Sequence, residues 1–410
     1  MQHDGHTVRP RLLFLGPTLP YPPDRGAALR GYYTLRALGR RYEIDALCFR
    51  QPDDPTQMPL DDRVRRLEAM AHLQLVPMPD ESGLLRRAAR LWSRVSGSPA
   101  PGTYADRRYR RRVVETVFER DPRIVHVDSI RLHEYLPMLA DRTVVLVHDE
   151  PIRADAIGRG EEGGHEPGGG EQSASADLGR ALARVAVTLV PFESRRDALL
   201  ERVPGARVEV VPPAIDLRHF RPASGTGHGL AYVGGTRSRA DRDALEYFTS
   251  DILPKLRASS GVQALEPISW IGPAREGDRA EYRRRGIDVT GYVEDIRPVV
   301  RPVACYVIPR RHEGAQTRLL QAWAMGKAVV STSAGCGGLD AVDGRNLLIR
   351  DDPAAFARAV LDVLEDRELR RRLGEGGRKT VEAGYGWDQR GRELVEMYQR
   401  LEGTPPRVPA

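Results

Sequence analysis

The amino-acid sequence predicts an α/β protein with two domains, each built on a parallel sheet. Short apolar runs such as 12–15 and 44–49 alternate with segments of helical periodicity, which is typical of parallel sheets. The chain has 410 residues, more than a single hydrophobic core usually serves. The alternation begins again after the proline-containing stretch 212–222, so we expect a domain boundary near residue 215.

The first domain is expected to span residues 1–215. A glycine- and proline-rich loop follows its first strand, then a helix at about 27–40, and a second loop covers 51–63. Residues 158–175 are rich in Gly and Glu, which predicts a disordered loop. The apolar runs predict strands at 12–15, 44–49, 73–77, 124–127, 144–147, 187–190 and 208–211.

The second domain is expected to span residues 216–385, followed by a terminal helix at 386–402. This last helix is amphipathic, because Leu394, Val395, Tyr398 and Leu401 share one face. Earlier helices are predicted at 316–325, 353–364 and 367–372. The strands of this half are predicted at 230–233, 268–271, 289–290, 304–308, 328–332 and 347–349.

Charge and cysteine content restrict the partners and the compartment. The net charge is +6 and the pI is near 9.3, which suits a nucleotide, an acidic membrane surface or a nucleic acid, although an arginine-rich surface without a partner fits equally. Cys48, Cys305 and Cys336 are far apart and form no CxxC, which favours a reducing compartment. With no apolar run of about 20 residues and no secretory signal in residues 1–10, we expect a cytoplasmic protein.

The most informative motif lies between residues 311 and 331. Glu313 follows the strand at 304–308, so it stands just outside the carboxyl end of that strand. The helix that begins at Gln316 offers the amides of Gln316, Thr317, Arg318 and Leu319, and a helix amino terminus favours phosphate. A carboxylate for sugar hydroxyls beside a phosphate cradle is what a nucleotide-sugar site requires.

These features together resemble the GT-B glycosyltransferases, and within them the retaining family 4, or group 1. The resemblance covers nearly the whole chain and is most specific in the second half, where a Glu-Gly loop precedes Leu-Leu-Gln-Ala-Trp-Ala-Met-Gly-Lys. The amino-terminal Pro20–Gly26 stretch with Arg30–Tyr32 is similar to a subgroup associated with bacterial exopolysaccharide clusters. Further similar stretches are 208–216, 220–222, 344–349 and the start of the final helix at Trp387.

The resemblance implies roles for the motif residues. The first acid of the family's paired glutamates holds the donor sugar, and Glu313 matches it; the second holds the nucleotide ribose, and Gln321 stands there instead. A neutral amide still hydrogen-bonds a ribose, so this departure affects donor affinity or base choice rather than the fold. Arg318, in the first helical turn, is expected to clamp the diphosphate with its guanidinium fork.

A glycine turn opens the second domain. Gly234 and Gly235 follow the strand 230–233, and glycines let the backbone approach a pyrophosphate. The family places an Arg and a Lys near this point, and Arg237 and Arg239 are the nearby substitutes; a plain turn with solvated arginines is the alternative. The Asp-Arg-Asp run at 241–243 is interpreted as the first turn of a helix rather than a metal site.

In the first domain, Gly26 ends the loop after the first strand. The resemblance places this glycine opposite the departing diphosphate, although Pro22 and Pro23 could equally explain the shape of the loop. Nearby Arg25 and Arg30 could add positive charge.

Two histidines compete for a role beside the sugar or the acceptor. His148 follows the strand 144–147 and is the best match to the family's histidine, with Asp149 as its orienting partner. His126 and Asp128 follow the preceding strand and are the alternative. A structural role for either histidine is the third interpretation.

Residues 84–112 combine many arginines with an apolar stripe that includes Trp92. A basic amphipathic helix of this kind can lie on an anionic membrane, or it can pack on the core with a solvated basic face. No nucleic-acid-reading motif is visible, so nucleic-acid binding is disfavoured.

The sequence therefore predicts a glycosyltransferase that moves a sugar from a nucleotide diphosphate sugar to the hydroxyl of a glycan, a lipid-linked or a small-molecule acceptor. The resemblance implies a retaining reaction with no metal or other cofactor, in polysaccharide, glycolipid or natural-product glycosylation. The alternatives are a GT-B nucleotide-sugar epimerase and a non-catalytic GT-B partner subunit. The expected location is the cytoplasm, with peripheral contact to the inner face of the membrane through 84–112.

Overall fold

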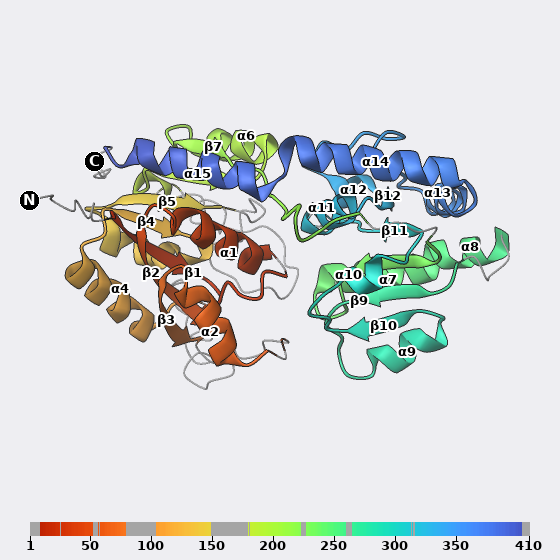
Figure 1. Cartoon of the computed structure of the whole chain (residues 1–410), viewed down its shortest axis with the longest axis horizontal. Helices are drawn as coiled ribbons and strands as arrows, with labels where there is room; N and C mark the ends of the chain where they lie inside the picture. Colours follow the sequence, from red (N-terminus) through yellow and green to blue (C-terminus); the bar gives the residue numbers. More distant parts are fainter. Residues whose placement is uncertain are drawn as a thin grey trace, which may run out of the picture. The chain divides into compact units, whose positions relative to one another are not determined.

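The chain folds into two compact units that divide at Pro212 and Pro213 (Figure 1). The computed structural model describes residues 9–24, 26–51, 56, 58–78, 104–148, 179, 181–222, 227–259, 265–312, 314 and 316–403. The first unit takes in the last part of the chain from Gly391, while the second runs from Pro213 to Arg390. The predicted α/β fold with two parallel sheets is confirmed.

The first unit contains a seven-stranded parallel sheet in the order β3-β2-β1-β4-β5-β6-β7. Alternate residues of β1 enter two different cores, Leu13 and Leu15 on one face and Leu12 and Phe14 on the other, so both faces of the sheet are covered. Its strands are β1 (Arg11–Gly16), β2 (Glu43–Arg50), β3 (His72–Pro77), β4 (Ile124–Val127), β5 (Thr143–Val147), β6 (Val187–Val190) and β7 (Val208–Val210).

Helices cover both faces of this sheet. One face packs against α4 and η1, while the other packs against α1 and the last helix, α15, so that the sheet lies between α4 and α15 (Figure 1). Leu394, Met397, Tyr398 and Leu401 of α15 are buried in the first unit. The helices are α1 (Gly26–Leu38), α2 (Leu60–Glu68), α4 (Arg107–Arg120), the 3₁₀ helix η1 (Ile130–Leu139), α6 (Glu193–Arg202) and α15 (Trp387–Leu401).

The second unit contains a six-stranded parallel sheet in the order β10-β9-β8-β11-β12-β13. Its strands are β8 (Leu230–Val233), β9 (Ile268–Ile271), β10 (Asp288–Gly291), β11 (Cys305–Ile308), β12 (Ala328–Ser331) and β13 (Leu348–Ile349). Its helices are α7 (Arg239–Tyr247), the π-helical η2 (Phe248–Ile252), α8 (Leu253–Ser259), α9 (Asp278–Arg284), α10 (Arg297–Val300), α11 (Gln316–Ala324), α12 (Ser333–Cys336), α13 (Pro353–Glu365) and α14 (Arg367–Gly384).

Two predictions of local structure are wrong. Helix α2 begins at Leu60, inside the stretch predicted to be a loop, and α14 continues far beyond its predicted end at 372. Its glycines look like helix breakers but allow close packing: a Cβ on Gly374 would lie 2.2 Å from the Gly326 carbonyl oxygen, and one on Gly377 would lie 2.2 Å from Trp323. The low-complexity stretch 158–175 and most of 84–112 lie outside the described residues. Within those residues, no helix combines the length and the apolar character that crossing a bilayer requires.

Candidate functional site

The centre of the second sheet has the geometry of a ligand site. Strands β8 and β11 are neighbours, and the chain leaves them toward opposite edges of the sheet, so the strand order reverses between them. In open α/β sheets, ligands bind outside the carboxyl ends of the strands at this switch point. Gly234 follows β8, and Arg310 comes two residues after the end of β11.

The turn after β8 is held closely against the neighbouring strand. Gly235 has a φ of +89°, and a Cβ at this position would lie 2.4 Å from the carbonyl oxygen of Pro273. The indole Nε1 of Trp270 donates to the Gly235 carbonyl at 3.1 Å, and the Thr236 amide donates to Pro273 at 2.9 Å. The sequence therefore needs glycine at 235 to keep this turn in place.

A buried carboxylate, Asp241, organises the charges at this edge. It lies in the first turn of α7, whose N-cap Ser238 accepts a hydrogen bond from the Asp241 amide at 3.1 Å. Arg310 donates to its Oδ1 at 2.9 Å, and Arg318 binds both carboxylate oxygens, with 2.9 Å between Nη2 and Oδ2. The Tyr232 hydroxyl donates to Oδ1 at 2.9 Å. We call Tyr232, Asp241, Arg310 and Arg318 the Asp241 cluster.

Two guanidinium groups share one carboxylate in the Asp241 cluster. Burial opposes ionisation of Asp241, but Arg318, Ser238 and Arg310 outweigh it and hold its pKa below the usual value. Burial raises the pKa of the Tyr232 hydroxyl to about 12, so it stays neutral. Asp241 therefore stays ionised and holds both guanidinium groups at this edge of the sheet.

Arg318 retains hydrogen-bonding capacity for such a ligand. Its Nη1 donates to Tyr232 at 2.7 Å and to Asp241, and its Nη2 donates to Asp241. These bonds use three of the five N–H groups of a guanidinium, which leaves Nε and one Nη2 hydrogen without a partner among the described residues. The side chain is 22% exposed, so it can be reached from solvent.

The remaining residues of the predicted motif differ in their surroundings. Gln316 begins α11, where its Nε2 donates to the Gly337 carbonyl at 3.2 Å, and Thr317 is half-buried beside it. Leu319 is fully buried in the core of the second unit. Gln321 is 3% exposed, and its side-chain amide has no hydrogen-bond partner in the described part of the chain. Glu313, the predicted sugar-holding acid, lies outside the described residues.

The arginines after β8 are solvent-exposed, as are the groups around Asp243. Arg237 precedes α7 and Arg239 is its first residue, and both are exposed. Asp243 binds Arg311 at the end of β11, with 3.1 Å between Oδ2 and Nε. Both aspartates of the Asp-Arg-Asp run lie in the first half of α7, and each pairs with an arginine that follows β11.

In the first unit, His148 directly follows β5 at the carboxyl edge of the sheet. Its ring is 5% exposed and its amide donates to the Leu189 carbonyl at 2.8 Å. Gly26 is the first residue of α1, with a φ of +24° and open space where a side chain would be. The expected partner Asp149 lies outside the described residues, as does Arg25.

The competing histidine, His126, is part of the packed interior. Its ring stacks on Phe14 with 5.0 Å between ring centroids, Nδ1 meets the Tyr398 hydroxyl, and Nε2 lies 3.3 Å from Asp128. Arg30 donates to the same carboxylate at 2.8 Å. These contacts join β4, α1 and α15, and Asp128 pairs with Arg30.

Sequence reasoning missed Arg310, Asp241 and Tyr232 as members of one cluster. Arg310 could have been found, because it follows a buried strand as directly as Glu313 does. The pattern of Ser238 three residues before Asp241 marks a helix start, but it contains no sign of the arginine at 318. The cluster joins residues 77 positions apart, and only the fold brings them together.

Comparison with known proteins finds a family that resembles the part of the chain that contains this site. Residues 227–366 match the family model for glycosyl transferases group 1. The chain is 37% identical over 146 residues to the lipopolysaccharide core biosynthesis glycosyltransferase LpsE of Rhizobium meliloti, covering 33% of this chain and 42% of that protein. It is 27% identical over 263 residues to a D-inositol 3-phosphate glycosyltransferase of Salinispora arenicola, covering 56% of each. The matched stretches thus span about half the length of these curated relatives.

Solved structures extend the likeness of fold over nearly the whole chain. Sucrose-phosphate synthase from Thermosynechococcus elongatus superposes with a TM-score of 0.66 at 15% identity, covering 96% of this chain and 99% of that one. Anabaena HepE in complex with UDP gives a TM-score of 0.64 at 13% identity, covering 95% and 100%. The chain therefore has the GT-B fold, and the resemblance to group 1 glycosyltransferases is confirmed, with the family match lying in the second unit.

Proposed function

We propose that this protein transfers a sugar from a nucleotide diphosphate sugar to an acceptor hydroxyl, with retention of configuration and without a metal. The observation that carries this proposal is the Asp241 cluster, which fixes the partly exposed guanidinium of Arg318 near the switch point of the second sheet, inside the stretch that matches group 1 glycosyl transferases. A diphosphate leaving group gains negative charge in the transition state, and a fixed guanidinium stabilises that charge.

The described residues support a division of roles. Arg318 offers its remaining N–H groups to the diphosphate, and the exposed Arg237 adds charge after β8. The buried amide of Gln321, which lacks a partner among the described residues, suits a ribose hydroxyl. By resemblance to the family, Glu313 holds the donor sugar, and His148 with Asp149 orients the sugar or the acceptor.

Nucleotide binding tests the donor half of the proposal. Thermal shift against nucleoside mono- and diphosphates should show a larger stabilisation by the diphosphate than by the monophosphate of the preferred base. At a hundred times its Kd, the diphosphate should stabilise the protein by about 2.7 kcal/mol in total. Arg318→Lys keeps the charge but loses the fork, so the preference for diphosphate over monophosphate should shrink. Arg283→Gln, an exposed arginine on α9, is the matched control. No stabilisation by any nucleotide or nucleotide sugar would refute the proposed enzyme.

Product analysis tests the reaction itself. Glu313→Gln should abolish sugar transfer while nucleotide binding persists, since the acid is assigned to the sugar. Transfer should continue in excess EDTA, and the anomeric configuration of the product should match that of the donor. An epimerised sugar formed without any acceptor would instead establish the epimerase, which binds the same donor. Nucleotide binding without turnover of any donor would point to a non-catalytic subunit.

The acceptor and the location follow from the wider resemblance. We propose a glycan, lipid-linked or small-molecule acceptor in bacterial exopolysaccharide or glycolipid synthesis, reached from the cytoplasm. LpsE, which is named for lipopolysaccharide core biosynthesis, is consistent with an acceptor carried on a lipid. Peripheral contact with the inner face of the membrane through 84–112 would bring the first unit to such an acceptor.

A further inference from the structure

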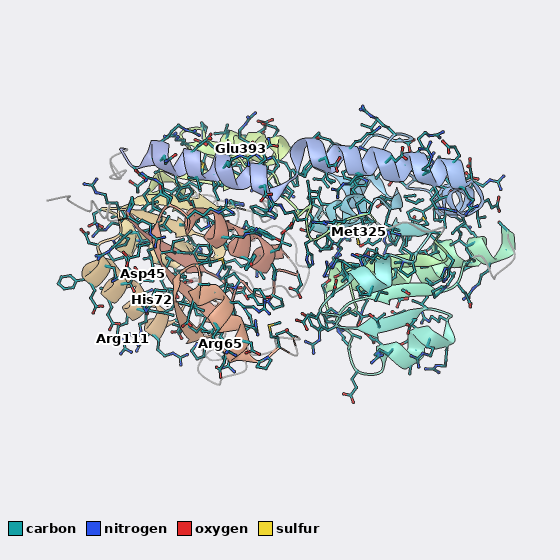
Figure 2. The ribbon with its side chains drawn as sticks, in the orientation of Figure 1. Asp45, Arg65, His72, Arg111, Met325 and Glu393 are labelled. Atoms are coloured by element: carbon teal, nitrogen blue, oxygen red, sulfur yellow. The ribbon has the colours of Figure 1, made fainter. Side chains whose placement is uncertain are left out.

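Helix α4 presents an unusual outer face to solvent. Arg107, Arg111, Val114 and Phe118 follow one another at spacings of four, three and four residues, so they form one stripe along the helix. Phe118 is 87% exposed and Val114 is 51% exposed, which places them among the few exposed large hydrophobic residues that the structure describes. Arg111 lies on the side of α4 turned away from the sheet (Figure 2).

The opposite face of α4 is fixed to the first unit. The Tyr109 hydroxyl donates to the Leu47 carbonyl at 2.8 Å, and its ring stacks on Phe49 with 4.2 Å between centroids. At the other end, Arg120 Nε donates to the buried Asp45 at 3.1 Å. Because both ends of the helix are anchored through its inner face, Phe118 lies on the outer face of α4.

The charges on the first turns of α4 are mostly positive, whereas Glu115, Glu119 and Asp121 are the acids nearest to Phe118 in the sequence. Five of the six arginines of α4 are exposed. Glu115 pairs with Arg112 at 3.2 Å and lies 3.6 Å from Arg111, whereas Arg107 and Arg110 have no ion-pair partner within the described ranges. A partner for this surface must therefore supply negative charge over the first turns and an apolar environment near Phe118. The surface of an anionic bilayer supplies both the negative charge and the apolar environment, because its phosphates lie next to the acyl chains.

We propose that the α4 outer face, made of Arg107, Arg110, Arg111, Val114 and Phe118, docks on an anionic lipid bilayer. Phe118 and Val114 enter the interface between headgroups and acyl chains, while the arginines bind lipid phosphates. This assignment gives a described surface to the membrane contact proposed above, and it holds whether or not the second unit transfers a sugar.

Vesicle sedimentation tests the surface with the full-length chain. We expect binding to phosphatidylcholine vesicles containing phosphatidylglycerol, little binding to phosphatidylcholine alone, and weaker binding at high salt. The double variant Arg107→Gln with Arg110→Gln should bind about thirty-fold more weakly, since each arginine near an anionic surface contributes roughly five-fold. Phe118→Ser should lose about ten-fold, because the ring no longer enters the interface.

Matched controls distinguish binding through this surface from a nonspecific effect of charge or hydrophobicity. Arg283→Gln with Arg284→Gln removes the same charge from the exposed face of α9, and Val342→Ser removes an exposed hydrophobic residue of the second unit. Both controls should bind vesicles like the wild type. Equal losses in test and control variants would overturn the proposal, as would unchanged binding by Phe118→Ser. Binding to a DNA oligonucleotide, or self-association that Phe118→Ser abolishes, with no vesicle binding would also overturn it. A nucleotide-induced thermal shift in each variant reports on the donor site separately.

Discussion

Replacing Asp241 by Asn should destabilise the second unit by several kcal/mol. The carboxylate is 4% exposed and neutralises part of the charge of Arg310, 5% exposed, and of Arg318. Two opposite charges about 4 Å apart attract by roughly 4 kcal/mol at the effective dielectric constant of protein sites. Breaking a buried pair from one side costs about 3–5 kcal/mol, because the remaining charge is left uncompensated. We therefore expect a loss near 4 kcal/mol.

Urea unfolding followed by tryptophan fluorescence measures this loss, because three of the four tryptophans, Trp270, Trp323 and Trp387, belong to the second unit. Asp243→Asn is the matched control two residues further along α7. Its partner Arg311 is 53% exposed, so that pair should contribute no more than about 1 kcal/mol. If Asp241→Asn costs no more than this control, the substitution does not leave buried arginine charge uncompensated, and the reasoning fails.

Three further predictions concern pH, the glycine turn and the terminal helix. The lowered pKa of Asp241 means that its contribution is complete above its unfolded pKa of about 4 and disappears as the pH falls through the folded value, so the stability gap between wild type and Asp241→Asn should close in acid urea titrations. Gly235→Ala should destabilise far more than Gly277→Ala, since both glycines have positive φ but only the first meets backbone atoms; equal melting temperatures would contradict this. Tyr398→Phe should cost the first unit about 1–2 kcal/mol by removing the hydroxyl that contacts His126; urea unfolding followed by far-UV circular dichroism measures this, and an unchanged midpoint would exclude that role.

The strands were the part of the fold that sequence could predict best. Ile124–Val127, Val187–Val190 and Leu230–Val233 are predominantly apolar runs whose ends coincide with the observed strands, because strands buried on both faces of a sheet are mostly apolar. The extent of α14 could not be predicted in the same way. Its glycines weaken an isolated helix, and the packing of Gly377 on Trp323, which favours them, is a contact between distant segments.

The candidate site shows the same division between local and distant information. Gly234, Gly235 and Arg318 could be found from motifs, since each belongs to a short pattern at the end of a strand or the start of a helix. The engagement of Arg318 by Asp241 could not be found, because it joins two helices through side chains 77 positions apart. The contact between His126 and Tyr398 of α15 likewise joins residues 272 positions apart, so no local pattern predicts it.

The division of the chain also affects the order in which the protein can fold during synthesis. The core of the first unit includes Leu394, Met397 and Tyr398, which leave the ribosome after the whole second unit. At roughly 5–20 residues per second, the amino-terminal sheet waits on the order of ten to forty seconds for its last helix. During that time the surface that α15 will cover stays open, so chaperone binding to nascent chains should be strongest before residue 401 emerges.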